Sequence, residues 1–207
     1  MKKNQKSKNG KHDHTMGNGK QPKQKRSPLH STRIDLNEKV RGHLCEILNQ
    51  TLADSLDLYT QTKQAHWNVK GVHFYQLHLL FDEIAGEILD YVDLFAERIT
   101  SLGGTAFGTV RMAAEASSLP DYPTDIDEGM EFVVALAERL AHYGETLREN
   151  IDVTDDLGDK DTADIYTEVS RDIDKRLWFL EAHLQAGSAE RETSHGTLVT
   201  QARRGSA

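Results

Sequence analysis

The run HFYQLHLLFDEIAGEILDYVDLFAERITSLGG, residues 73–104, decides the fold of this 207-residue chain. Its apolar residues recur at steps of three and four, the spacing of one face of an α-helix. They are Leu77, Phe81, Ile84, Ile88, Val92, Phe95, Ile99 and Leu102. Gly103 and Gly104 follow directly and end the pattern, as glycine does after a helix. At about 1.5 Å per residue this predicts a helix longer than about 40 Å.

The same spacing recurs on both sides of this run. It begins at Ile34 and predicts a first long helix that ends near Asn68, before Gly71. A third helix is predicted after Thr124 or Asp125, either of which is a suitable N-cap. A fourth is predicted from Asp161 or Thr162 to about Leu184.

The second and third helices are joined by a long connection, residues 105–123, which is rich in glycine, serine and proline. A short helix is expected within it, at residues 111–116. Nothing in the sequence favours a sheet. We therefore predict an all-α fold, a ferritin-like four-helix bundle with a long crossover between helices 2 and 3 and a short helix in the crossover.

Charge divides the chain into a basic arm and an acidic body. The net charge is −8, but residues 1–33 carry ten Lys and Arg against one Asp, so residues 34–207 carry −17. The arm has too few apolar residues to form a core, and we expect it to be disordered when free. The predicted organisation is a basic N-terminal arm at 1–33, a bundle at 34–185 and a polar C-terminal tail at 186–207.

Composition excludes several classes of protein. No apolar run approaches the roughly 20 residues of a membrane helix. The basic N-terminus is followed by no apolar segment of a signal peptide, so a cytoplasmic location is expected. Cys45 is the single cysteine, which excludes an intrachain disulfide and a zinc cluster built on cysteines. Any metal must bind to His, Asp and Glu.

Candidate metal ligands lie on one face of the second helix. At 100° per residue, His78, Asp82, Asp93 and Glu97 share an arc of about 100°. His66 and Trp67 end the first helix, close to the start of the second. The same residues are also compatible with a solvent-exposed helix face whose histidines make ordinary hydrogen bonds. The number of hard metal ligands next to the apolar face favours a metal site instead.

One helix cannot complete such a site alone. Asp82 and Asp93 are about 16 Å apart along the axis, whereas ligands lie about 2.0–2.6 Å from their metal. The Glu-x-x-His pattern of bundles with an internal di-iron site occurs only at Glu192–His195, in the polar tail. A second copy, antiparallel across a twofold axis, would bring the two halves together at two equivalent sites. Carboxylates with imidazole suit Fe(II), with Mn or Zn as alternatives.

Three stretches of the sequence carry a resemblance to a known family. KQAHWNVKG (63–71), FYQLHLLFDEI (74–84) and DLFAERITSLGG (93–104) closely resemble the signature of the Dps family, the DNA-binding mini-ferritins of starved or oxidatively stressed bacteria. LPDYPTDI (119–126) and DTADIYTEVSRDIDKRLWFLEAHL (161–184) are similar to later segments of the same family. The resemblance covers residues 34–185.

The resemblance implies a set of roles. The ferroxidase ligands would be His66, His78 and Asp82 of one subunit with Asp93 and Glu97 of its twofold mate. Trp67 would be a redox-active neighbour of the site, although it equally fits simple interfacial packing. The assembly would be a hollow homododecamer that oxidises Fe(II), preferably with hydrogen peroxide, and stores ferric mineral.

The basic arm suggests sequence-independent DNA binding, with a solubilising tail as the alternative. Its charges are Lys2, Lys3, Lys6, Lys8, Lys11, Lys20, Lys23, Lys25, Arg26 and Arg33. If DNA is bound, association with the nucleoid is expected. The arm also contains His12, His14 and His30, which are candidates for binding a transition metal. Acidic residues that are candidates for a pore or cavity wall are Glu138, Glu145, Glu149, Asp152, Asp155 and Asp156.

The preferred function is therefore a ferroxidase and iron store that protects DNA from oxidative damage. An architectural DNA-binding protein with a vestigial metal site is the first alternative, and the complete ligand set argues against it. A metal-dependent bundle enzyme acting on an organic substrate is the second. The lack of an intrachain site counts against that one.

Overall fold

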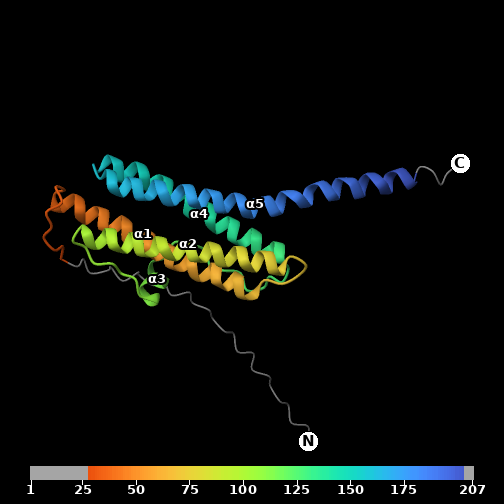
Figure 1. Ribbon diagram of the computed structural model, residues 1–207, viewed down its shortest axis with the longest axis horizontal. Helices are drawn as coiled ribbons and strands as arrows, with labels where there is room; N and C mark the ends of the chain where they lie inside the picture. Colours follow the sequence, from red (N-terminus) through yellow and green to blue (C-terminus); the bar gives the residue numbers. More distant parts are fainter. Residues whose placement is uncertain (1–27, 203–207) are drawn as a thin grey trace, which may run out of the picture.

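Four long helices and one short one make up the computed structural model, which describes residues 28–202, with side chains to Gln185. They are α1 (Glu38–Asn68), α2 (Phe74–Ser101), α3 (Val110–Ala116), α4 (Gly129–Asp156) and α5 (Lys160–Ala202). No strand occurs among the described residues, and α3 lies in the crossover between α2 and α4 (Figure 1). The predicted all-α bundle with a helix in its crossover is confirmed.

The bundle consists of two helix pairs. α1 packs along α2, α4 packs along α5, and α3 lies against α1 (Figure 1). Both pairs contribute large side chains to one core in which the largest are fully buried, such as Phe81, Phe95, Leu136, Tyr143 and Tyr166. The buried residues of α2 lie on the helix face that was predicted from the spacing of its apolar residues. No described helix is long and apolar enough to cross a membrane.

The first helix begins at Glu38, four residues later than predicted. The side chain of Asn37 caps it by accepting a hydrogen bond from the Val40 N–H (3.0 Å). Residues 30–36 instead run along the end of α2, because the buried Arg41 donates to the carbonyls of His30 and Leu36, 3.2 and 3.3 Å away. The apolar residues of this segment continue the helical spacing, but these contacts hold the backbone outside the helix.

The segment 30–36 is held in close contact with the C-terminal end of α2. The His30 N–H donates to the Gly103 carbonyl (2.8 Å), and Arg41 donates to the Leu102 carbonyl (2.6 Å). Gly103 has a φ of 88°, and a Cβ on it would lie 2.3 Å from the His30 carbonyl oxygen. Glycine is therefore required at Gly103 both for the backbone conformation and for the close approach.

The predicted N-cap of the third long helix, Thr124 or Asp125, is wrong. Glu128 is the N-cap of α4, and the Glu131 side chain accepts the backbone N–H groups of Asp127 and Glu128 at 2.9 and 3.0 Å. A Cβ on Gly129 would lie 2.9 Å from the Lys70 carbonyl oxygen. Packing of Gly129 against the turn between α1 and α2 thus fixes where α4 begins.

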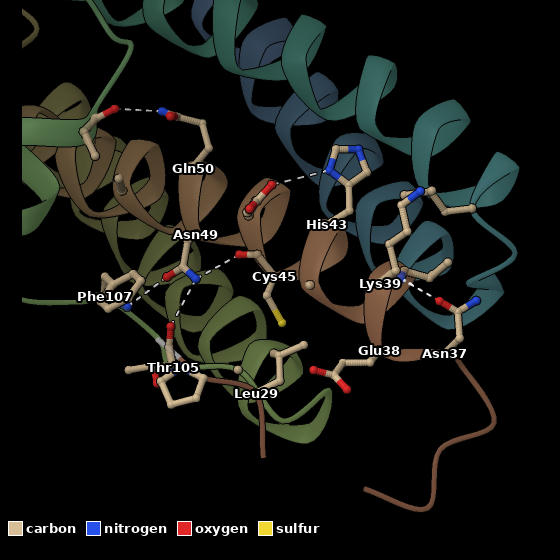
Figure 2. A pocket seen from close by; sticks show the side chains of 18 of the residues that line it. Leu29, Asn37, Glu38, Lys39, His43, Cys45, Asn49, Gln50, Thr105 and Phe107 are labelled. Atoms are coloured by element: carbon tan, nitrogen blue, oxygen red, sulfur yellow. Dashed lines mark hydrogen bonds and ion pairs between the residues drawn. The ribbon is translucent and has the colours of Figure 1, made fainter. Parts of the chain in front are cut away.

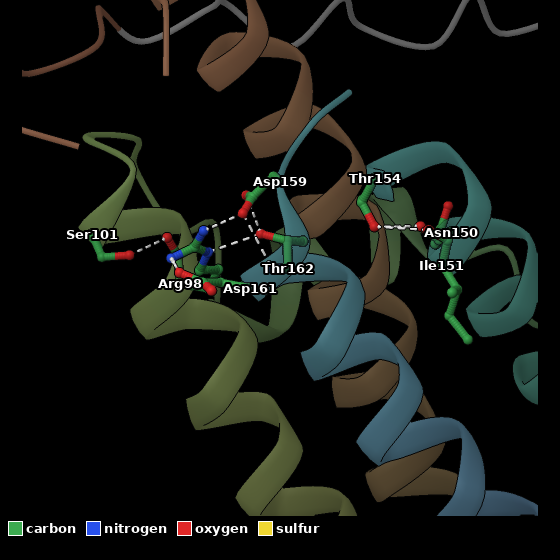
Figure 3. A network of polar contacts seen from close by, with 8 residues as sticks. All are labelled: Arg98, Ser101, Asn150, Ile151, Thr154, Asp159, Asp161 and Thr162. Carbon is green, nitrogen blue, oxygen red and sulfur yellow. Dashed lines mark hydrogen bonds and ion pairs between the residues drawn. The ribbon is translucent and has the colours of Figure 1, made fainter. Parts of the chain in front are cut away.

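The fourth long helix begins at Lys160, one residue before the predicted start. Asp159 caps it by accepting from the Thr162 N–H (3.2 Å). Arg98 of α2 donates to Asp159 (2.6 Å) and to the Thr162 hydroxyl (2.8 Å), so the cap also joins α2 to α5 (Figure 3). The helix continues to Ala202, through most of the segment expected to be a polar tail. That segment contains no proline to stop it.

Candidate metal centre

His66 and His78 meet where α1 passes into α2. Their rings stack with centroids 3.8 Å apart and planes 17° from parallel. The Nδ1 of each ring lies 2.8 Å from the backbone carbonyl oxygen of the other residue. A carbonyl oxygen only accepts, so each Nδ1 carries a proton and donates it. In the neutral form of this tautomer the lone pair of Nε2 is free, and Nε2 is then the atom that can bind a metal.

The turn between the helices makes this reciprocal arrangement possible. α1 ends at Asn68, and Gly71 turns the chain with a φ of 98° before α2 begins at Phe74. The Phe74 ring then stacks on His78 with centroids 5.1 Å apart. His66 is buried, whereas His78 is half-buried between the two rings. The sequence placed these histidines close together, and the structure confirms it.

Asp82 lies one turn after His78 and near the ring of His66. Its Oδ1 is 3.9 Å from the Nε2 of His66 and 2.7 Å from the ammonium of Lys63. The hydrogen bond from Lys63 lowers the pKa of Asp82, with a smaller contribution from the charge of Lys63. The carboxylate is therefore ionised and remains exposed. One anionic oxygen therefore lies beside the two imidazoles.

The structure does not bring Asp93 and Glu97 to this group. Both are exposed and lie three to four turns further along α2. Within residues 28–185, no three His, Cys, Asp or Glu side chains are arranged to hold a metal ion. The predicted ligands therefore form two separate halves on one helix face, one with both histidines and Asp82, the other purely acidic.

Lys63 is the site residue that sequence reasoning missed. It lies one turn before His66 and Trp67 on α1, so helical spacing alone would have placed it beside them. Its ammonium stands 5.7 Å from the centroid of the Trp67 ring and forms the ion pair with Asp82. Trp67 itself is 67% exposed. In the single subunit it covers no part of the core.

A groove of about 1220 Å³ lies elsewhere, between the first half of α1 and residues 104–116 (Figure 2). Asn49 spans it by donating to the carbonyls of Cys45 (2.8 Å) and Thr105 (3.1 Å) and by accepting the Phe107 N–H (2.9 Å). Cys45 is buried, which raises the pKa of its thiol. These hydrogen bonds join α1 to residues 105–107 across the groove.

The remaining predicted residues are dispersed. Glu138, Glu145, Glu149, Asp152, Asp155 and Asp156 all lie on α4, where Asp155 pairs with Lys160 and the others are exposed. His30 is engaged through its backbone at the end of α2. His12, His14 and the basic residues from Lys2 to Arg26 lie outside the described residues.

Comparisons with known proteins agree with this architecture. The family model of the ferritin-like domain matches residues 45–189, so the fold and the match define a ferritin-like protein. The DNA protection during starvation protein of Agrobacterium fabrum is 43% identical over 77% of this chain and 98% of its own. The structure of DpsC from Streptomyces coelicolor is 34% identical, with a TM-score of 0.73 over 79% of this chain and 95% of that one.

A third comparison concerns the Dps protein of Vibrio cholerae. Its structure is 26% identical, with a TM-score of 0.70 over 76% of this chain and 99% of that one, and it is described as a member of a broad superfamily of ferritin-like diiron-carboxylate proteins. The present chain belongs to the Dps family.

Proposed function

We propose that the protein is a ferroxidase and iron store whose sites are shared between two subunits. The observation that carries the proposal is the pair of histidines with both Nδ1 atoms engaged and both Nε2 atoms free, beside an ionised Asp82. Asp93 and Glu97 supply the remaining carboxylates on the same face of α2. Its relatives' names, which refer to DNA protection, and the diiron-carboxylate superfamily support this function.

Each side chain has a separate task in the proposed reaction. Fe(II) is the substrate, and the two imidazoles bind it through Nε2 while their backbone hydrogen bonds fix the ring orientation. Asp82 and the acidic half of the partner subunit neutralise its charge, which favours the Fe(III) product. Iron at Asp82 would compete with Lys63 for this carboxylate. Trp67, which is exposed on the same turn, would donate an electron at the site or pack against the partner.

The oxidant proposed is hydrogen peroxide. One peroxide accepts two electrons, one from each of two Fe(II) ions, and with two protons yields two waters and two Fe(III). A site able to hold two Fe(II) ions would match this stoichiometry, because both electrons would then leave without releasing a hydroxyl radical. The acidic face of α4, with −17 on residues 34–207 overall, would attract Fe(II) and nucleate mineral inside a homododecameric shell. Mn or Zn would compete for the same ligands.

Complementation between two defective variants tests the shared site. His66→Ala/His78→Ala removes one half and Asp93→Ala/Glu97→Ala removes the other, so each protein alone should lose most of its Fe(II) oxidation. In a mixed pair, one of the two sites collects all the wild-type ligands, and co-assembly should recover part of the rate. Peroxide-dependent ferric absorbance gives the measurement. Mixed assemblies no faster than either parent would refute the intersubunit site.

A second function, DNA binding by the arm, rests on charge. The body repels phosphate, and the arm joins it at the anchored segment beginning at Pro28, where His30 and Arg41 fasten the chain to the end of α2. Lysines on a chain without base-reading motifs should bind any sequence. Binding should weaken steeply between about 50 and 200 mM salt, since each neutralised phosphate contributes about −0.9 to the salt slope.

Deleting residues 1–27 tests this second function while keeping the anchor intact. The truncated protein should lose its DNA mobility shift at low salt and retain its particle mass and Fe(II) oxidation. A deletion that also removed His30 would disturb its contact with Gly103. A loss of DNA binding could then come either from the missing charges or from damage to the bundle. If the truncated protein shifts DNA as strongly as the full chain, the arm is not the binding element.

A further inference from the structure

The groove along the first half of α1 lies where the described chain begins. Pro28 and Leu29 are both among its lining residues. The Leu29 side chain is half-buried over Gly42 of α1, and a Cβ on that glycine would stand 3.6 Å from it. His30, the next residue, is fastened to the Gly103 carbonyl. The chain before Pro28 is therefore attached at the groove itself.

The groove is long, and much of its lining is apolar. One wall is α1 over residues 37–53, and the other is the crossover over residues 104–116 (Figure 2). Its apolar lining residues include Val40, Cys45, Ala53, Phe107, Met112 and Leu157. The volume of about 1220 Å³ exceeds the range of about 300–1,000 Å³ that is usual for small-molecule pockets. A segment of polypeptide suits this space better than a small molecule.

The residues directly before Pro28 fit the length of the groove. From Gly42 to Ala53, α1 extends about 17 Å at about 1.5 Å per residue, and about five residues of extended chain cover that distance. Those five residues are KQKRS, residues 23–27, which we call the docking segment. Pro28 favours an extended conformation of the residue before it. Lysine and arginine also cover apolar surface with their aliphatic stems while their charged ends stay in water.

Charge favours the same occupant. Glu46 lies on the groove one turn after Gly42, exposed and 3.6 Å from the Nδ1 of His43. Glu38 and Lys39 lie on the groove one turn before Gly42. The docking segment carries three positive charges and no acidic residue, so it is attracted to Glu46. A second copy would instead bring another body with −17 on residues 34–207, which the first one repels.

We propose that the docking segment of the arm binds in this groove of its own subunit and pairs its basic side chains with Glu46. Only residues 1–22 of the arm are then free to bind DNA. They keep six lysines, which are Lys2, Lys3, Lys6, Lys8, Lys11 and Lys20. The consequence for DNA rests on the proposed function of the arm, whereas the docking does not. The body thereby limits how many phosphates each arm neutralises.

Tryptic cleavage of the full chain, followed by mass spectrometry, tests the docking at each basic residue. Cleavage follows the population of the open form when opening is fast. Cuts after Lys23, Lys25 and Arg26 should therefore be about tenfold slower than cuts within residues 2–11. Glu46→Lys places a like charge on the groove and should speed cleavage in the docking segment about fivefold or more, with no change at residues 2–11. Glu168→Lys, the same change at an exposed position of α5 outside the groove, is the matched control.

Cys45 gives a second measurement at the groove itself. It is the single cysteine, and it is buried and lines the groove (Figure 2). A docked segment should slow its reaction with a maleimide, so deleting residues 1–27 should speed labelling about fivefold or more. Glu46→Lys should act in the same direction. If the deletion leaves the labelling rate unchanged, the docking segment does not cover the groove and the proposal is overturned.

The remaining outcomes also separate docking from DNA binding. Circular dichroism should show that Glu46→Lys keeps its helices, since Glu46 is exposed. Equal cleavage at all basic residues of the wild-type arm would overturn the proposal, as would protection that Glu46→Lys leaves intact. If the docking segment is protected as predicted while neither protein shifts DNA, the docking stands and the proposed DNA binding fails. If both hold, Glu46→Lys should steepen the salt slope of DNA binding, by about 0.9 for each released charge that engages a phosphate.

Discussion

The two ends of α2 carry ion pairs that are built in opposite ways. Near the C-terminal end, Arg98 and Asp159 are 12% and 3% exposed, and the Thr162 hydroxyl and N–H complete their hydrogen bonds (Figure 3). Near the N-terminal end, Asp82 is 55% exposed and holds Lys63, with the free Nε2 of His66 3.9 Å away. The first pair is closed, because its hydrogen bonds are satisfied inside the protein. The second pair is open, because the Asp82 carboxylate and the Nε2 of His66 can still bind a ligand.

This contrast explains why only one of the pairs is a candidate site. A buried carboxylate whose partners are all in place stabilises a junction, here between α2 and the start of α5. Asp82 has a single lysine partner and is itself 55% exposed, so it exchanges that partner at lower cost, because ion pairs open to solvent contribute only about 0–1 kcal/mol. The difference leads to four predictions.

The largest effect should come from opening the closed pair. Asp159→Ala leaves the Arg98 guanidinium largely buried without its carboxylate and removes the cap of α5, so the free energy of unfolding should fall by about 3–5 kcal/mol. Asp82→Ala, at the exposed pair, should change it by less than about 1 kcal/mol. Urea unfolding at one protein concentration compares the two. Equal losses would remove the distinction between closed and open pairs.

The pH dependence of stability should reflect the same pair. Burial acts to raise the pKa of Asp159, but the hydrogen bonds from Arg98 and Thr162 outweigh it and leave the pKa lowered. A lowered folded-state pKa means that its stabilisation is complete above the unfolded value of about 4 and is lost as the pH falls through the folded value. The difference in unfolding free energy between wild type and Asp159→Asn should therefore be constant from about pH 5 to 7 and shrink below about 4. A difference that grows in acid would contradict this sign.

A smaller effect is expected at the open pair. Lys63→Met removes the ammonium that competes for Asp82 while keeping a side chain of similar length. The affinity for Zn(II), a redox-inert probe of the ligands, should rise about three- to tenfold, since an exposed pair is worth about 1 kcal/mol or less. Isothermal titration calorimetry measures it. Lys70→Met, which breaks the exposed Lys70–Asp127 pair, is the control and should leave the affinity unchanged. Weaker Zn(II) binding in Lys63→Met would show that Lys63 holds Asp82 in place for the metal.

The smallest effect should be at Cys45, which belongs to neither pair. It packs as a small apolar residue with its Sγ 3.8 Å from the Ile99 carbonyl oxygen, and Cys45→Ala removes only this atom. The loss of stability should be about 1 kcal/mol or less, with unchanged particle mass and Fe(II) oxidation. A Cys45→Ala protein that folds but fails to oxidise Fe(II) would reveal a role for the thiol.

Local spacing predicted most of the fold and one part of the candidate site. The apolar periodicity identified all four long helices, and the short helix was expected at 111–116 and found at Val110–Ala116. Helix starts were less predictable. Ile34 continues the apolar spacing, yet α1 begins at Glu38 because Arg41 binds the carbonyls of His30 and Leu102, 11 and 61 positions away along the chain. Thr124 and Asp125 are good caps by type, but packing of Gly129 beside Lys70 places the start of α4 later.

What the sequence alone determined is the line of candidate ligands along α2, because the geometry of a helix sets the direction of every side chain once the spacing is known. It also determined that this line is too long for one metal site. Only the tertiary structure decided that the two histidines exchange backbone hydrogen bonds and that Lys63 occupies Asp82. These contacts join residues 12 to 19 positions apart, on two helices. Their geometry depends on the turn at Gly71 and on how α1 packs against α2, which no local pattern encodes.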